Sequence, residues 1–242
     1  MKNLLLVFSN PLNDRHEDFN DWYTNVHIRD VMRMPASVAV QRLVLADEQQ
    51  PGHPVSAYRY LAMYETDDTA KCTAAHAVAM TPKLPISETF DLTSPCNYFR
   101  LRSFVTADPM AAADGDLVLA EFATPDAFDL AAAGRIVGRN GVLSIAHLSV
   151  LGDQLVPRDP TQPEIALFRL TGAGARPTAA DVAAVVRKPA IVSRYRPLIP
   201  RLTADNVLHA TAQEQAIESR ARAALEGKVH NLAFENGVVS SS

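Results

Sequence analysis

The order in which strand-like and helix-like segments follow one another is the feature that most constrains the fold of this chain. Short runs rich in Val, Leu and Phe, bounded by turn residues, alternate with longer stretches of helical periodicity. The expected segments are a strand at 2–9, a helix at 15–34, strands at 37–46 and 57–66, a helix at 67–80 and a strand at 95–105. This β-α-β-β-α-β order is typical of a split βαβ unit.

The same order of elements restarts after residues 107–115, whose Ala, Asp and Gly content is typical of a linker. The second set comprises strands at 117–123, 142–151, 164–171 and 191–198 and helices at 125–137 and 179–187. The repeat is one of element order and not of sequence. We therefore expect a unit carrying the site at 1–106, a second and degenerate unit at 115–200, and a C-terminal helix and tail at 201–242.

Each predicted unit leaves one face of its sheet without a cover. An antiparallel four-stranded sheet with both helices on one face has a bare, largely apolar second face, which another sheet must cover. Either the two halves pack face to face within one chain, or each chain pairs with a second copy, and the sequence leaves both arrangements open. In the tail, residues 210–226 are Ala-rich with alternating charge, which favours a helix that Gly227 ends.

The composition narrows the class of partner. A net charge of −4 provides no broad basic field for nucleic acid or anionic lipid, and no apolar run approaches the roughly 20 residues that cross a bilayer. With two cysteines and no secretion signal, we expect a cytoplasmic location and no disulfide framework. The histidines follow no metal-ligand spacing and no nucleotide fingerprint is present, so we expect neither a metal nor a cofactor.

The densest cluster of chemically useful side chains lies in the first predicted helix. Tyr23, His27 and Asp30 are spaced four and three residues apart, which places them near one stripe of a helix. Histidine can accept and donate a proton at neutral pH, and a carboxylate can orient its ring, so these three are the candidate catalytic residues. The alternative is that the aromatic residues form the core face of the helix, with His27 at its edge.

The third predicted strand adds a set of tyrosines. Alternation places Tyr58, Tyr60, Ala62 and Tyr64 on one face, which suits either a pocket for an aromatic ligand or ordinary packing within the sheet. On the preceding strand, Arg42 is positioned either to bind an anionic ligand or to pair with Glu65. In the second half, His147 shares a predicted face with Leu143 and Ile145, which favours a core histidine over one that lines a cavity.

The first half resembles the EthD-like proteins of the dimeric α+β barrel family. The match covers residues 2–105 and consists of Trp22-Tyr23, His27, Pro35, Arg42 and Tyr64-Glu65. It departs from the pattern at Ala36, where the family has Gly, so the turn into the second strand is expected to differ. The second half lacks the aromatic pair and the helix histidine, which implies one site per chain.

The resemblance implies an α+β fold of two tandem ferredoxin-like units whose antiparallel sheets pack as a dimeric α+β barrel, and a homodimer. It also implies a cofactor-independent lyase, isomerase or cyclase acting on a small hydrophobic, aromatic, lactone or polyketide-like substrate. His27 would be the acid/base, Tyr23 or Tyr64 would stabilise charge on oxygen, and Arg42 would anchor the substrate, with Trp22 and Tyr60 as further contacts. A cofactor-free monooxygenase, a haem-binding relative and a non-catalytic ligand-binding or assembly protein are the alternatives.

Overall fold

Eight antiparallel strands form a closed barrel in the computed structural model, which describes residues 3–68, 70–71, 84–105, 115–151, 161–172, 175–230, 232–235 and 238–241. The strands of the first half are β1 (Asn3–Ser9), β2 (Ser37–Leu45), β3 (Tyr60–Thr66) and β4 (Cys96–Val105). Those of the second half are β5 (Leu117–Phe122), β6 (Val142–Val150), β7 (Glu164–Leu170) and β8 (Ile191–Pro197). Around the barrel the order is β3-β1-β4-β6-β7-β5-β8-β2, and pairing of β2 with β3 closes it.

Barrel closure takes place within one chain, which decides between the two arrangements that the sequence left open. The first half has the strand order β2-β3-β1-β4, and the second half has the equivalent order β6-β7-β5-β8. The halves join through β4 with β6 and through β2 with β8, while the short strand β9 (Leu202–Thr203) pairs with β2 beyond the end of β8. The predicted helix at 67–80 and the linker at 107–115 lie largely outside the described residues.

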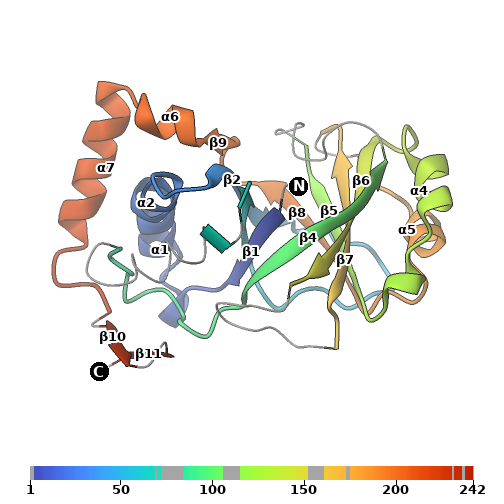
Figure 1. Ribbon diagram of the computed structural model, residues 1–242, viewed down its shortest axis with the longest axis horizontal. Helices are drawn as coiled ribbons and strands as arrows, with labels where there is room; N and C mark the ends of the chain where they lie inside the picture. Colours follow the sequence, from blue (N-terminus) through green and yellow to red (C-terminus); the bar gives the residue numbers. More distant parts are fainter. Residues whose placement is uncertain are drawn as a thin grey trace.

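Helices cover the outside of the barrel on two opposite sides (Figure 1). On one side lie α1 (His16–Trp22), the π-helical segment η2 (Tyr23–His27) and α2 (Ile28–Met32), preceded by the 3-10 turn η1 (Leu12–Asp14). On the other side lie η3 (Pro125–Ala127), α4 (Leu130–Ile136) and α5 (Ala179–Val185). The single helix expected at 125–137 is broken, because Phe128 is extended and the Asp129 side chain caps α4 by accepting a hydrogen bond from the Ala132 N–H.

The C-terminal region adds a further layer over α1 and α2. This layer consists of α6 (Ala204–Leu208) and α7 (Ala212–Ala224), and a hairpin of β10 (Leu232–Glu235) and β11 (Val238–Ser241) follows it in the chain. The helix expected at 210–226 is thus confirmed, and Gly227 follows it with a φ of +75°, the left-handed conformation that favours glycine. Within the described residues, no helix is long and apolar enough to cross a membrane.

Three apolar cores stabilise this arrangement. The barrel interior is packed with side chains from both halves, including Leu6, Phe99, Leu167 and Tyr195, each fully buried. A second core lies between the first half's sheet and α1–α2, and a third between the second half's sheet and α4–α5. Each half therefore has an outer sheet face, covered by helices, on which polar or charged side chains can be buried.

In the turn before β2, Ala36 has a backbone conformation that glycine adopts more readily. Ala36 has a φ of +68°, in the left-handed region that disfavours residues with a Cβ atom. The family resemblance led us to expect that this turn differs from one with Gly, and that expectation stays a prediction. The chain holds the glycine conformation with an alanine and is strained at this residue.

Candidate functional site

The π-helical segment Tyr23–His27 gathers three aromatic rings at one point of the first helix. The His27 ring lies 4.8 Å from the Tyr23 ring and 4.9 Å from the Trp22 ring, measured between centroids. Residues five apart point in different directions in an α-helix, whereas i→i+5 bonding turns the chain less per residue and brings Trp22 and His27 together. π-helical turns of this kind occur frequently at functional sites.

Asp30 is paired with two arginines, Arg222 and Arg33. Its carboxylate accepts hydrogen bonds from both terminal nitrogens of Arg222 on α7, one of them at 3.2 Å, and lies 3.4 Å from Arg33. The stripe expected for Tyr23, His27 and Asp30 assumed uniform α-helical spacing, which the π-helical segment interrupts. The structure therefore brings Tyr23 to His27 and directs Asp30 to two guanidinium groups.

Arg42 is the centre of the buried polar cluster between β2 and the first helix. Its side chain is 1% exposed, and its guanidinium carbon lies 4.4 Å from the centroid of the Tyr23 ring. It donates hydrogen bonds to the Thr24 hydroxyl at 2.6 Å and to the Asn20 side-chain oxygen at 2.8 Å. Burial lowers the pKa of Arg42 to about 10, although the nearby tyrosines oppose this shift.

The expected alternative, a pair between Arg42 and Glu65, is wrong. Glu65 lies on the opposite face of the sheet from Arg42 and is 1% exposed. It accepts two hydrogen bonds from Arg201, at 2.6 and 2.8 Å. All described partners of Arg42 are neutral groups. Its positive charge is therefore buried beside hydroxyl, amide and aromatic groups and without a carboxylate among them.

The tyrosines of β3 surround the same guanidinium. The Tyr64 hydroxyl donates to that of Tyr23 at 3.4 Å, and burial raises the pKa of both phenols, so both stay protonated at neutral pH. The Tyr60 hydroxyl accepts from the Asn20 amide at 2.9 Å and lies 3.1 Å from Nδ1 of His16. Three phenols and one guanidinium thus share one buried layer.

Tyr58 does not belong to this layer, which corrects the predicted face of four residues. β3 begins only at Tyr60, after a loop that contains Pro51, Gly52 and Pro54, so the strand alternation does not extend back to Tyr58. Its ring instead packs beside Phe8, with 6.1 Å between centroids, against the core inside the barrel.

Sequence reasoning missed the polar residues that hold Arg42 and Tyr60 in place, namely His16, Asn20 and Thr24. Asn20 and Thr24 are four residues apart, so they share the helix face that meets the sheet. Polar side chains on a helix face that is otherwise aromatic were the signal available in the sequence.

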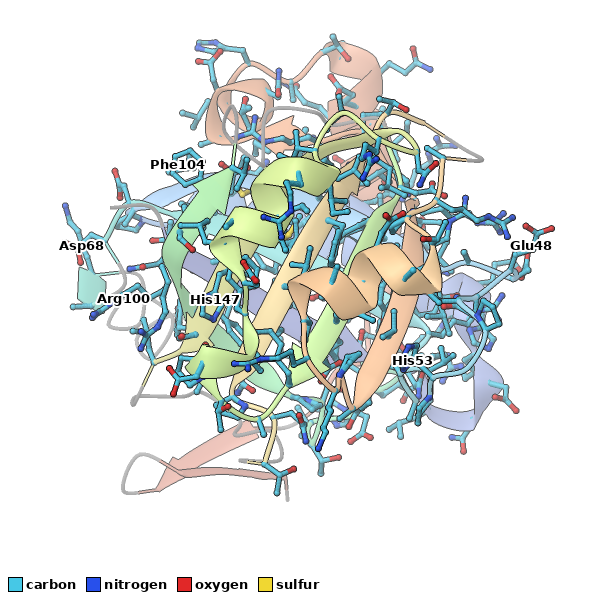
Figure 2. The ribbon with its side chains drawn as sticks, turned by 90° about the vertical axis from the view of Figure 1, so that its right-hand side faces the viewer. Glu48, His53, Asp68, Arg100, Phe104 and His147 are labelled. Atoms are coloured by element: carbon cyan, nitrogen blue, oxygen red, sulfur yellow. The ribbon has the colours of Figure 1, made fainter. Side chains whose placement is uncertain are left out.

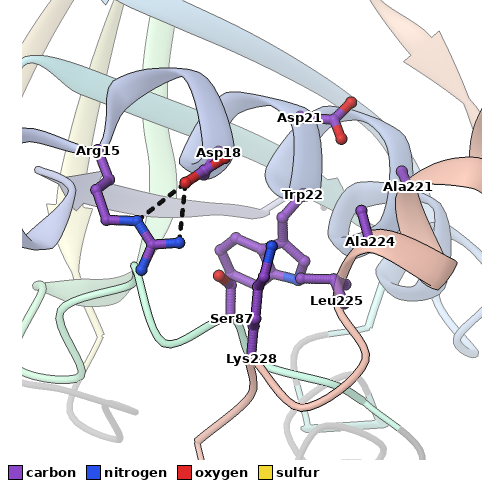
Figure 3. Close-up of a pocket in the computed structure, with 9 residues that line it drawn as sticks. All are labelled: Arg15, Asp18, Asp21, Trp22, Ser87, Ala221, Ala224, Leu225 and Lys228. Carbon is purple, nitrogen blue, oxygen red and sulfur yellow. Dashed lines mark hydrogen bonds and ion pairs between the residues drawn. The ribbon is translucent and has the colours of Figure 1, made fainter.

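A small pocket adjoins the outer edge of Trp22, between α1 and α7 (Figure 3). Its volume is about 40 Å³, and its walls include Leu225 and Lys228. The Trp22 indole N–H donates to the Pro85 carbonyl at 2.9 Å. A volume of this size accommodates water and not an aromatic substrate.

No group of three or more metal-ligating side chains lies close enough together to hold a metal ion among the residues that the structure describes.

Two solved structures share the fold of this chain. One is titled an anthrone oxidase-like protein, with 13% identity, a TM-score of 0.57 and coverage of 87% of this chain and 96% of the other. The second, from Fusobacterium nucleatum, is titled "Putative monooxygenase", with 6% identity, a TM-score of 0.51 and coverage of 83% and 94%. No family model and no curated protein sequence matches.

At such low identities the similarity extends to the fold alone. It supports the dimeric α+β barrel type that the sequence resemblance implied, with the closed barrel formed inside one chain. The narrower EthD-like assignment stays a prediction.

Proposed function

We propose that this chain is an enzyme that ionises a small, weakly acidic aromatic substrate, such as a phenol or an enolisable ketone, against Arg42. The observation that carries the proposal is a guanidinium group that is 1% exposed and whose partners among the described residues are all neutral. Burying an unpaired charge is costly, and the pKa of about 10 reflects that cost. A substrate anion would supply the missing negative charge in surroundings where electrostatic attraction is strong.

The neighbouring side chains suit the remaining tasks. His27, in contact with the Trp22 and Tyr23 rings, is the proposed base that removes the proton. Tyr23 and Tyr64 stay protonated; Tyr64 donates its proton to the Tyr23 oxygen, and Tyr23 can donate its own to a substrate oxygen. Trp22 and Tyr60, which are 1% and 5% exposed, are the proposed aromatic contacts of the substrate ring. Asp30 is left out of the catalytic set because Arg33 and Arg222 neutralise it.

Oxidation by molecular oxygen is the reaction that we favour after this deprotonation. The titles of the two similar structures name an oxidase-like protein and a monooxygenase. A lyase or isomerase would instead return the proton to another atom of the substrate. In the oxidation of a ring CH₂ to C=O, the substrate loses four electrons, one oxygen atom of O₂ enters it, and the other leaves as water. The chain would supply a base and a cation.

The haem alternative fits the described residues poorly. A porphyrin needs a flat open slot beside an axial ligand, whereas the rings of Trp22 and Tyr23 pack against His27 at less than 5 Å.

Oxygen uptake with anthrone as a model substrate tests the proposal. We expect Arg42→Met and His27→Gln to reduce the rate at least about a hundredfold, given the usual contribution of such groups. Arg59→Gln, which changes an exposed arginine, is the matched control. If both site variants retain the wild-type rate, the assignment is wrong; ligand binding without turnover would favour a non-catalytic binding protein.

We also infer that the halves are two ferredoxin-like units, because their strand orders are equivalent. The homodimer is a separate proposal, because the barrel closes without a second copy. Light scattering on the purified protein tests it by measuring the molecular mass in solution.

A further inference from the structure

The second half carries a polar residue at the position equivalent to that of Arg42. In the first half, Arg42 pairs with Ala62 on β3, two residues from the pair of Val44 with Tyr60. In the second half, His147 pairs with Ala166 on β7, two residues from the pair of Ser149 with Glu164. Each polar side chain faces the helix layer across from an alanine, which leaves it room.

His147 is held by a carboxylate and enclosed by aromatic rings. Its Nε2 atom lies 2.7 Å from a Glu164 oxygen, and because a carboxylate only accepts, Nε2 carries the proton. Phe128 stacks on the imidazole at 4.6 Å and Phe122 lies at 5.5 Å, measured between centroids. Burial lowers the pKa of His147, although Glu164 opposes this, so the ring is neutral at neutral pH. Its Nδ1 atom therefore keeps a lone pair, on the side of the ring away from Glu164.

Two arginines of β4 lie at the outer edge of this cluster. Arg102 donates to the Ser149 hydroxyl, which in turn donates to Glu164. Arg100, which pairs in register with Ser149, is exposed on the same strand. Figure 2 looks onto this side of the molecule and labels Arg100 and His147. Among the described residues, the charged groups in contact with this cluster are Glu164 from β7 and Arg102 from β4.

Apolar packing would stabilise this part of the core at least as well as the buried pair of His147 and Glu164. The surrounding core consists of aliphatic and aromatic residues such as Ile145 and Phe168, and an apolar side chain at position 147 would fill the same space. Buried ionic pairs contribute little net stability compared with well-packed apolar groups, and oriented acid/base pairs are concentrated at functional sites. A neutral base beside a cation is the combination that removes a proton and then stabilises the anion.

We propose that the second half holds its own ligand site, in which Nδ1 of His147 accepts the proton of a small compound with an acidic O–H group. Glu164 orients the imidazole and is itself linked to Arg102 through the Ser149 hydroxyl, and the imidazolium that forms pairs with the resulting anion. The chain then has two sites related by the symmetry of the barrel, one built on a cation and one on a base. This replaces the expectation of one site per chain.

The experiment measures binding of 4-nitrophenol, whose absorbance distinguishes the phenol from the phenolate. The wild-type chain, Arg42→Met, His147→Gln and Arg102→Gln are titrated, with Arg135→Gln on α4 as the matched exposed-arginine control. Glutamine at 147 retains a donor for Glu164, and thermal unfolding of each variant verifies that it is folded. We expect Arg42→Met to keep the His147 site and His147→Gln to lose it. Arg102→Gln should weaken binding at the His147 site about tenfold, because Arg102 no longer holds Ser149 and Glu164 in place.

The outcomes separate this site from that of Arg42. One equivalent bound by the wild type and lost in His147→Gln supports the site proposed here and contradicts the one at Arg42. Binding that His147→Gln leaves unchanged, binding lost only in Arg42→Met, or no binding at all overturns the proposal.

Discussion

Replacing Arg42 with methionine distinguishes the contribution of Arg42 to the stability of the fold from its proposed role in binding the substrate anion. Each pKa unit corresponds to about 1.4 kcal/mol, so a displacement from 12.5 to about 10 means that burial disfavours the charged group by roughly 3 kcal/mol. Two short hydrogen bonds, to Thr24 and Asn20, offset this by about 1–3 kcal/mol each. The terms nearly cancel, and methionine has a similar length without the charge. We expect the free energy of unfolding to change by less than about 2 kcal/mol.

Urea denaturation followed by fluorescence measures this change, because Trp22 is the sole tryptophan and its ring lies 5.3 Å from that of Tyr23. Arg42→Ala is the contrasting variant, since truncation leaves a cavity and should destabilise by about 2–4 kcal/mol. The same methionine variant should lose phenolate binding at the Arg42 site. The reasoning is refuted if Arg42→Met destabilises as much as Arg42→Ala while phenolate affinity at that site is unchanged.

Three further predictions concern the scaffold. Ala36→Gly relieves the backbone at φ +68° and should raise the unfolding free energy by about 0.5–1 kcal/mol, measured by urea denaturation; a loss would show that the turn is not strained. Gly227→Ala should lower the unfolding free energy by about 1 kcal/mol, because φ is +75° there; an unchanged thermal midpoint would contradict this. Hydrogen bonds from Arg33 lower the pKa of Glu218 to about 2, below its ordinary 4.5. Its contribution is present above pH 4.5 and is lost as the pH falls toward 2; with partners more than a third exposed, it amounts to about 1 kcal/mol. Glu218→Gln should flatten this part of the stability profile, and an unaltered profile would exclude the pair as its source.

The element order was the part of the fold that the sequence predicted best. Alternating apolar residues and turn signals located the eight barrel strands within about three residues, because both signals are local. The misplaced residues followed the local pattern but lie where contacts with distant residues decide the path of the chain. Tyr58 falls outside β3, and the helix expected at 125–137 breaks at Phe128, since a loop's path and a cap depend on what they pack against.

For the candidate site, the sequence predicted which residues lie together better than it predicted their hydrogen-bond partners. Tyr23, His27, Arg42, Tyr60 and Tyr64 were chosen for residue type and spacing, and the structure brings Arg42 against the three tyrosines and Tyr23 against His27. The partners of Arg42 were not predictable, because Asn20 and Thr24 reach it across the helix–sheet interface, and the π-helical segment has no reliable signature in a single sequence.

The sequence by itself determined two successive sets of strands and helices, each with a bare apolar sheet face, because hydrophobic periodicity is a property of neighbouring residues. Only the tertiary structure decided that the two faces cover each other inside one chain, through β4 with β6 and β2 with β8. Contacts between distant strands depend on register and closure, which local pattern does not encode. The register of β2 with β3 and of β6 with β7, within each half, makes His147 the counterpart of Arg42.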